Sequence, residues 1–108
     1  MTANNRSHFR FAVERRAALK YQGSTTACDL HNLTEDGLQL STEIPIPVGA
    51  TIQLECRLEA HTIIDCAVLI THATHPYIGG RITEISPEHR RQLIHFIQQL
   101  IETNLGGM

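Results

Sequence analysis

Hydrophobic and polar residues alternate along several short segments of the chain, and this period of two is typical of β-strands with one buried face. The clearest example is 52–58, in which isoleucine, leucine and cysteine alternate with glutamine, glutamate and arginine. Turn-forming pairs such as Gly23-Ser24 separate the segments. The pattern predicts six strands, at about 11–21, 26–31, 38–41, 52–58, 63–71 and 77–85.

Other segments depart from this alternation. Residues 63–71 are more continuously apolar, as expected for a strand that is buried on both faces. Two prolines and a glycine in 44–49 exclude a central strand there. Residues 32–37 contain Asn, Thr, Asp and Gly, which form local hydrogen bonds or accept positive φ, so we expect a turn that ends the second strand. Arg15 interrupts the alternation of the first strand.

The C-terminal region has a helical period instead. Ser86 is a suitable N-cap, and Pro87 fits the first helical turn. The glycines at 106 and 107 favour helix termination. We therefore expect a helix over about 87–104, with one apolar stripe formed by Leu93, Ile94, Ile97, Leu100 and Ile101.

These elements indicate a mainly-β fold of one domain, which suits a chain of 108 residues. Consecutive strands with short turns predict an antiparallel barrel or sandwich, closed or capped by the helix. No run approaches the roughly 20 apolar residues that span a bilayer, and the N-terminus lacks a signal-like apolar core. We expect a cytoplasmic protein without membrane insertion. Cys28, Cys56 and Cys66 lack metal-binding or disulfide spacing and are interpreted as buried structural thiols.

Charge is distributed unevenly along the chain. Residues 1–22 carry five basic residues against Glu14, a net charge of +4, so the remainder of a chain with net charge -2 sums to -6. We interpret 1–10 as a flexible basic arm and 11–105 as the folded domain. Such an arm favours an anionic partner, although a solvated tail would have the same composition.

Two short motifs stand apart from the core pattern. Arg6 and Arg10 form an R-x-x-x-R pair just before the first strand, and Asn32, Thr34 and Gly37 form an N-x-T-x-x-G motif between the second and third strands. In this order, and with a C-terminal helix, the chain resembles the PilZ domain family over roughly residues 5–103. The resemblance implies a six-stranded antiparallel β-barrel with a C-terminal helix. It also implies a stand-alone receptor for the bacterial second messenger cyclic di-GMP.

The resemblance carries the two motifs over as the cyclic di-GMP site. Arginine can bind guanine O6 and N7 or a phosphate with two parallel hydrogen bonds, so Arg6 and Arg10 suit this ligand. Asn32 can meet the guanine edge, Thr34 offers a hydroxyl, and Gly37 allows a close backbone approach or a positive φ. Binding would order the arm and alter contacts with an unidentified effector protein. Arg81 in the last strand is an additional candidate ligand.

Departures from the family pattern affect affinity and stoichiometry. Thr34 replaces the more usual serine and adds a methyl group, and Asn5 stands where many relatives have another arginine, so either one or two nucleotides could bind. Ile82 replaces a common phenylalanine.

Alternative functions have weaker motifs. His72 and His75 lie close in sequence, but residues three apart in a strand point to opposite faces, and no third ligand has a recognisable spacing. We therefore expect no metal site. No catalytic motif is present, and we expect neither an enzyme nor a nucleic-acid-binding protein. The second hypothesis is a protein-interaction adaptor of PilZ-like fold, related to pili or motility, that does not bind nucleotide. A monomer or weak dimer is expected.

Overall fold

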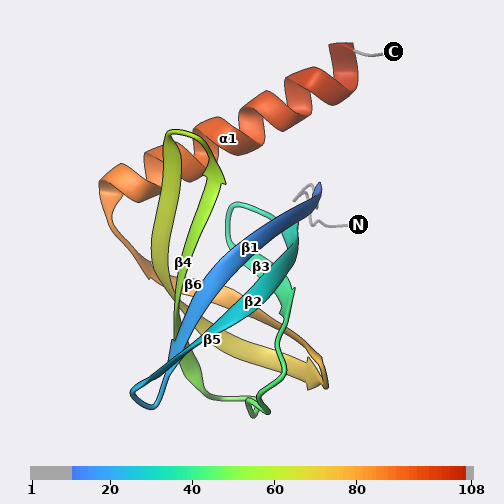
Figure 1. Cartoon of the computed structure of the whole chain (residues 1–108). Coiled ribbons are helices and arrows are strands. Elements are labelled where there is room, and N and C mark those ends of the chain that lie inside the picture. Colours follow the sequence, from blue (N-terminus) through green and yellow to red (C-terminus); the bar gives the residue numbers. More distant parts are fainter. Residues whose placement is uncertain (1–10, 107–108) are drawn as a thin grey trace, which may run out of the picture.

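The structure is a computed structural model that describes the backbone of residues 11–106 and the side chains of residues 11–103. Six antiparallel strands close into a barrel in the order β1-β2-β3-β6-β5-β4, and β4 pairs back to β1 (Figure 1). This confirms the mainly-β prediction and selects the barrel over the sandwich. The elements are β1 (Phe11–Tyr21), β2 (Ser24–Leu33), β3 (Gly37–Ser41), β4 (Thr51–Glu59), β5 (Thr62–Thr74), β6 (Tyr77–Ile85) and α1 (Pro87–Gly106).

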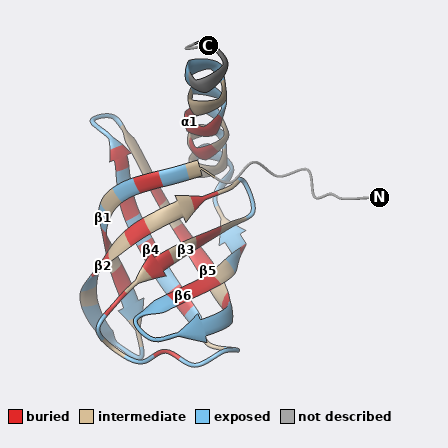
Figure 2. Cartoon of the chain, turned by 90° about the vertical axis from the view of Figure 1, so that its right-hand side faces the viewer, coloured by how far each residue is buried: buried red, intermediate tan, exposed pale blue. Residues whose placement is uncertain are grey.

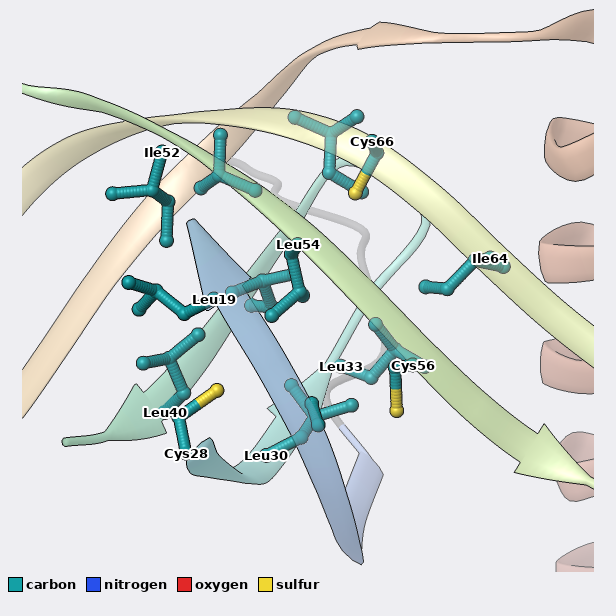
Figure 3. Packing of buried hydrophobic residues seen from close by; sticks show 14 of the residues in the cluster. Leu19, Cys28, Leu30, Leu33, Leu40, Ile52, Leu54, Cys56, Ile64 and Cys66 are labelled. Atoms are coloured by element: carbon teal, nitrogen blue, oxygen red, sulfur yellow. The ribbon is translucent and has the colours of Figure 1, made fainter. Parts of the chain in front are cut away.

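The barrel interior is filled by aliphatic side chains from all six strands. Every second residue of β4 is buried, from Ile52 to Leu58, as its alternation predicts. Leu19 of β1, Leu40 of β3 and Leu54 of β4 point toward one another in the centre and are fully buried (Figure 3). Burying each of these side chains stabilises the fold by about 1.5–3 kcal/mol. The alternation of buried and exposed bands along the strands is visible on the barrel wall (Figure 2).

Helix α1 crosses one end of the barrel, and its C-terminal part extends beyond the barrel wall (Figure 1). The Ser86 Oγ atom accepts a hydrogen bond from the backbone N–H of His89 at 3.1 Å, which is the expected N-cap. The helix contacts β5 and buries Leu93, Phe96 and Ile97. The predicted helix is confirmed, but its stripe was partly wrong: Phe96 is fully covered, whereas Ile94 is only half-buried.

Arg15 is a half-buried polar residue on the same face of β1 as Val13 and Ala17, next to a bulge between Ala12 and Arg15. Its Nε atom donates a hydrogen bond to the carbonyl of Leu58 at 2.7 Å, and its guanidinium lies 6.0 Å from the ring centre of Phe96. The next residue, Arg16, forms an exposed ion pair with Asp29 at 3.0 Å. Two of the positive charges that were counted in residues 1–22 therefore have partners on the barrel itself.

Some predicted boundaries were wrong. Strand β2 continues to Leu33, so Asn32 lies within a strand and the turn is shorter than 32–37. Strand β5 continues to Thr74, three residues beyond its predicted end at 71. It is not buried evenly on both faces, because Asp65 and Leu69 are half-buried. Pairing with β1 extends β2, and pairing with β6 extends β5, through polar residues that local patterns do not reveal.

All three cysteines are free and buried, as predicted. Burial raises the pKa of the Cys28 thiol to about 12, that of Cys56 to about 11 and that of Cys66 to about 12, because the thiolate form loses its hydration. These thiols stay protonated near neutral pH and act as small apolar core residues. In the part of the chain that is described, no helix has the length and apolar character needed to cross a membrane.

Candidate functional site

Thr34 organises the tight turn between β2 and β3. Its Oγ1 atom accepts hydrogen bonds from the backbone N–H groups of Asp36 at 3.2 Å and Gly37 at 2.9 Å. The same hydroxyl lies 3.2 Å from the Gly37 carbonyl, to which it donates, and the Thr34 N–H donates to that carbonyl at 2.9 Å. The hydroxyl predicted as a ligand contact is thus held within the turn, where it fixes the backbone.

Gly37 joins this turn to the neighbouring strand β6. A Cβ atom on Gly37 would lie 2.7 Å from the carbonyl oxygen of Gly80, closer than real Cβ contacts allow. Gly37 therefore allows a close approach between β3 and β6, and it does not adopt a positive φ. Its role toward a ligand stays a prediction. A hydrogen bond of 2.7 Å from the Ile82 N–H to the Asp36 carbonyl fastens the turn to β6.

The outer face of the barrel beside this turn carries a row of cross-strand partners. Asn32 on β2 pairs with Gln39 on β3, and its side-chain Nδ2 donates to Gln39 Oε1 at 2.6 Å. Gln39 pairs in turn with Gly79 on β6, and Gly79 pairs with His72 on β5. We call these four residues the outer row. Because they come from four adjacent strands, the barrel topology alone brings them together.

A cavity of about 200 Å³ opens over the turn and the outer row. Pockets for drug-sized ligands measure about 300–1,000 Å³, so this one suits a single ring system rather than a whole dinucleotide. Its polar groups are amides, hydroxyls and an imidazole, and its lining includes no acidic or basic side chain other than the histidine. The lining residues are Asn32, Leu33, Thr34, Gly37, Leu38, Gln39, Thr71, His72 and Gly80.

The predicted arginines are placed only in part. Arg81 is exposed on β6 directly opposite Gly37, two residues from Gly79 and therefore on the same outer face, next to the cavity. Arg6 and Arg10 lie outside the described residues. Strand β1 begins at Phe11, whose partner is Leu33 of the cavity lining, so the chain enters the barrel beside the site.

Among the polar residues that line the cavity, sequence reasoning missed Gln39, Thr71 and His72. Gln39 lies two positions after Gly37, and this spacing places both residues on one face of a strand. That signal was available in the sequence. His72 was considered only as a metal ligand, and its position depends on the pairing of β5 with β6. Within residues 11–103, no group of three or more metal-ligating side chains gathers.

Comparison with known families assigns most of the chain to one family. The PilZ domain family matches residues 4–99, so the chain belongs to this family. The barrel, the terminal helix and the Asn32-to-Gly37 turn all lie within or overlap the matched range. No curated protein matches the chain.

Solved structures of low identity share the fold. YcgR from Escherichia coli in complex with c-di-GMP superimposes with a TM-score of 0.80 at 18% identity, over 97% of this chain and 50% of that one. The PilZ domain of YcgR alone, also with c-di-GMP, gives a TM-score of 0.74 at 18% identity, covering 97% of this chain and 100% of the domain. The Bacillus subtilis inhibitor of motility MotI/DgrA gives a TM-score of 0.78 at 14% identity, over 93% of this chain and 53% of that one. This chain thus spans about half the length of YcgR and MotI/DgrA.

Proposed function

We propose that this chain is a receptor for cyclic di-GMP that binds one guanine in the cavity beside the Thr34 turn and binds the phosphates with arginines. The observation that carries the proposal is the cavity itself. Asn32, Thr34 and Gly37, the residues of the N-x-T-x-x-G motif, line it together with six other residues. The family's solved members include the YcgR PilZ domain with c-di-GMP, which supports this choice of ligand.

Asn32 suits the edge of a guanine base. Its Nδ2 already donates to Gln39, so its carbonyl oxygen remains to accept a hydrogen bond from a base N–H. The half-buried position of Asn32 strengthens such a bond, because less water competes for it. The Thr34 turn and the Gly37–Gly80 contact hold the surrounding backbone in place, so the cavity is formed before the ligand arrives.

The phosphates need positive charge that the cavity lining does not supply. Arg81 is exposed on the same face, next to the cavity. Arg10 is the covalent neighbour of Phe11, and Arg6 lies five residues from Phe11, within at most about 17 Å of chain. Both guanidinium groups can therefore reach a ligand in the cavity. Guanidinium groups bind phosphate with two hydrogen bonds in a geometry that lysine cannot reproduce.

Signalling follows from the same arrangement in this proposal. The arm 1–10 closes over the bound nucleotide, and the changed charge and shape of that barrel surface alter contact with a separate effector protein. Ordering of a segment by a charged ligand is a common type of molecular switch.

Calorimetric titration with cyclic di-GMP tests the receptor function. We expect binding that weakens as salt is added, because the ion pairs to phosphate lie on an open surface. Arg10→Ala should lower affinity more than tenfold, equivalent to about 1.4 kcal/mol, without changing thermal stability.

The matched control is Lys20→Ala, which removes the same charge from the far end of β1. Lys20 is exposed and pairs with Thr25 and Gln53, away from the cavity. The Lys20→Ala variant should retain wild-type affinity for cyclic di-GMP. No binding at high micromolar ligand would refute the receptor function. Equal losses of affinity in Arg10→Ala and Lys20→Ala would show that Arg10 contributes only nonspecific charge.

A further inference from the structure

His72 occupies a place in the outer row that its neighbour Gly79 creates. A Cβ atom on Gly79 would lie 2.2 Å from His72 Cε1, 2.4 Å from Nε2 and 3.1 Å from Nδ1, so the imidazole fills the space of the missing side chain. Gly79 is buried although its position faces outward, and His72 is itself exposed. The ring therefore lies over the β6 backbone, with the rest of its surface toward solvent and the cavity.

The backbone of β5 is adjusted at this point. The register between β5 and β6 shifts between Ile70 and His72, so that His72 comes opposite Gly79. The neighbouring Thr71 also reaches the cavity and donates from Oγ1 to the Gly79 carbonyl at 3.4 Å. A bulge of this kind redirects side chains on the strand that carries it. Its effect here is to bring an imidazole to the cavity wall.

The fold does not require this imidazole. Within the described part of the chain, its ring makes no hydrogen bond, ion pair or aromatic contact, and it contributes nothing to the buried core. The described residues also contain no cluster that would make it a metal ligand. An aromatic ring that is positioned by a glycine, exposed on one side and placed in a cavity is well suited to contact a planar ligand.

We propose that His72 is the base-stacking residue of this site, and this inference rests on the proposed binding of cyclic di-GMP. One guanine enters the cavity with its polar edge toward Asn32 and its face against the imidazole. Proteins commonly hold unpaired bases by stacking them on aromatic side chains, including histidine. Gly79 is then a positioning residue, because any larger side chain would displace the ring.

Substitutions at 72 separate stacking from hydrogen bonding. His72→Ala removes the ring, His72→Gln keeps a polar side chain, and His72→Phe keeps an aromatic face. We expect Ala and Gln to weaken cyclic di-GMP binding by about tenfold or more, and Phe to stay within about threefold of wild type. The guanine H8 proton resonance should move upfield on binding to wild type and Phe, but not to Ala or Gln. The exposed position predicts unchanged thermal stability for all three.

Gly79→Ala gives an independent test of positioning. It should weaken binding about as much as His72→Ala, and the double variant should be no weaker than either single variant, because both changes remove the same contact. His75→Ala is the matched control, since His75 is exposed nearby but lines no part of this cavity, and it should bind like wild type.

The outcomes distinguish this inference from the receptor function. If wild type binds and His72→Ala binds equally well, His72 is not part of the site and only the stacking inference fails. If His72→Gln retains affinity for cyclic di-GMP and His72→Phe loses it, the contact of residue 72 is a hydrogen bond and the stacking inference also fails. If wild type itself does not bind cyclic di-GMP, the receptor function fails and the inference fails with it.

Discussion

Strand β4 and the site wall formed by β2, β3 and β6 use the same extended backbone for different purposes. In β4 every inward residue is buried and every outward residue is exposed. In the site wall the inward residues are also buried, as Leu38 and Ile78 show, but the outward positions differ. Asn32 and Gln39 are half-buried polar residues there, and Gly37 and Gly79 carry no side chain.

This comparison shows how a small barrel can carry a polar cavity on its outer face without losing its core. The cavity lies on the outer face, where side chains are absent or polar, while the inner face of the same strands continues the hydrophobic cluster. Substitutions on the outer face should therefore affect binding more than stability. Substitutions on the inner face should do the reverse, and Gly37 should affect both because it contacts the β6 backbone.

Leu54→Ala tests the scaffold side of the comparison and has the largest expected effect. Leu54 is fully buried at the centre of the cluster (Figure 3). We expect the free energy of unfolding to fall by about 2–5 kcal/mol, through lost burial and the cavity that remains. Urea denaturation measures this loss. The control is Glu55→Ala, the exposed neighbour, which should change stability by less than about 0.5 kcal/mol.

The ligand affinity of folded Leu54→Ala should equal that of wild type at temperatures well below its melting point. A large loss of affinity in the folded variant would show that the core and the outer face are coupled, and would contradict the separation of stability from binding.

Gly37→Ala should affect both the stability of the scaffold and the binding of the ligand. The added Cβ atom would lie 2.7 Å from the Gly80 carbonyl, and a backbone group cannot move aside without separating β3 from β6. We expect a loss of about 1–3 kcal/mol in the free energy of unfolding, as for other overpacked positions, together with weaker binding of cyclic di-GMP. Glu35→Ala, an exposed residue of the same turn, should alter neither quantity. Normal stability in Gly37→Ala would mean that the strands are not in close contact.

Much of the scaffold could be predicted because its signals are local. The alternation around Leu54 and the capping sequence at Ser86 each depend on a few adjacent residues. The bulge before Arg15 and the length of β5 were not predictable, because they arise from pairing between distant strands. The closure of the barrel by β4 on β1 is likewise a long-range property.

The site divides in the same way. Asn32, Thr34 and Gly37 could be predicted because they lie in one short motif, and the structure brings all three to the cavity. His72 reaches that cavity only because β3 pairs with β6 and β6 with β5, an order that does not follow the chain. A single sequence carries no local signal for such an arrangement.

The buried thiols offer a pH test that addresses the scaffold alone. Burial raises the pKa of Cys66 from 9.0 to about 12, so the folded state holds this proton more tightly than the unfolded state. The resulting stability is fully present below about pH 9 and is lost as the pH rises toward 12. At pH 10 each such thiol should lower the free energy of unfolding by about 1.4 kcal/mol relative to its value below pH 9.

Cys66→Ala supplies the comparison for that test. Urea denaturation from pH 8 to pH 10.5 should show a steeper loss of stability in wild type than in Cys66→Ala, by about 1.4 kcal/mol per pH unit above pH 9. Other alkaline-titrating groups are the same in both proteins and cancel in the difference. Parallel curves would indicate that the thiol ionises in the folded protein as readily as in the unfolded chain.

Thr34→Ser has the smallest expected effect and sharpens the comparison at the site itself. Serine keeps the hydroxyl that accepts from Gly37 N–H and donates to the Gly37 carbonyl, so the turn should persist and stability should change by less than about 0.5 kcal/mol. Thr34→Val keeps the shape but leaves the partly buried Gly37 N–H without the hydroxyl to which it donates, and should lower the free energy of unfolding by about 1–3 kcal/mol. Paired thermal melts and titrations measure both variants. If valine is tolerated, the hydroxyl does not hold the turn. If serine binds markedly tighter than threonine, the methyl group crowds the ligand and limits the affinity of this receptor.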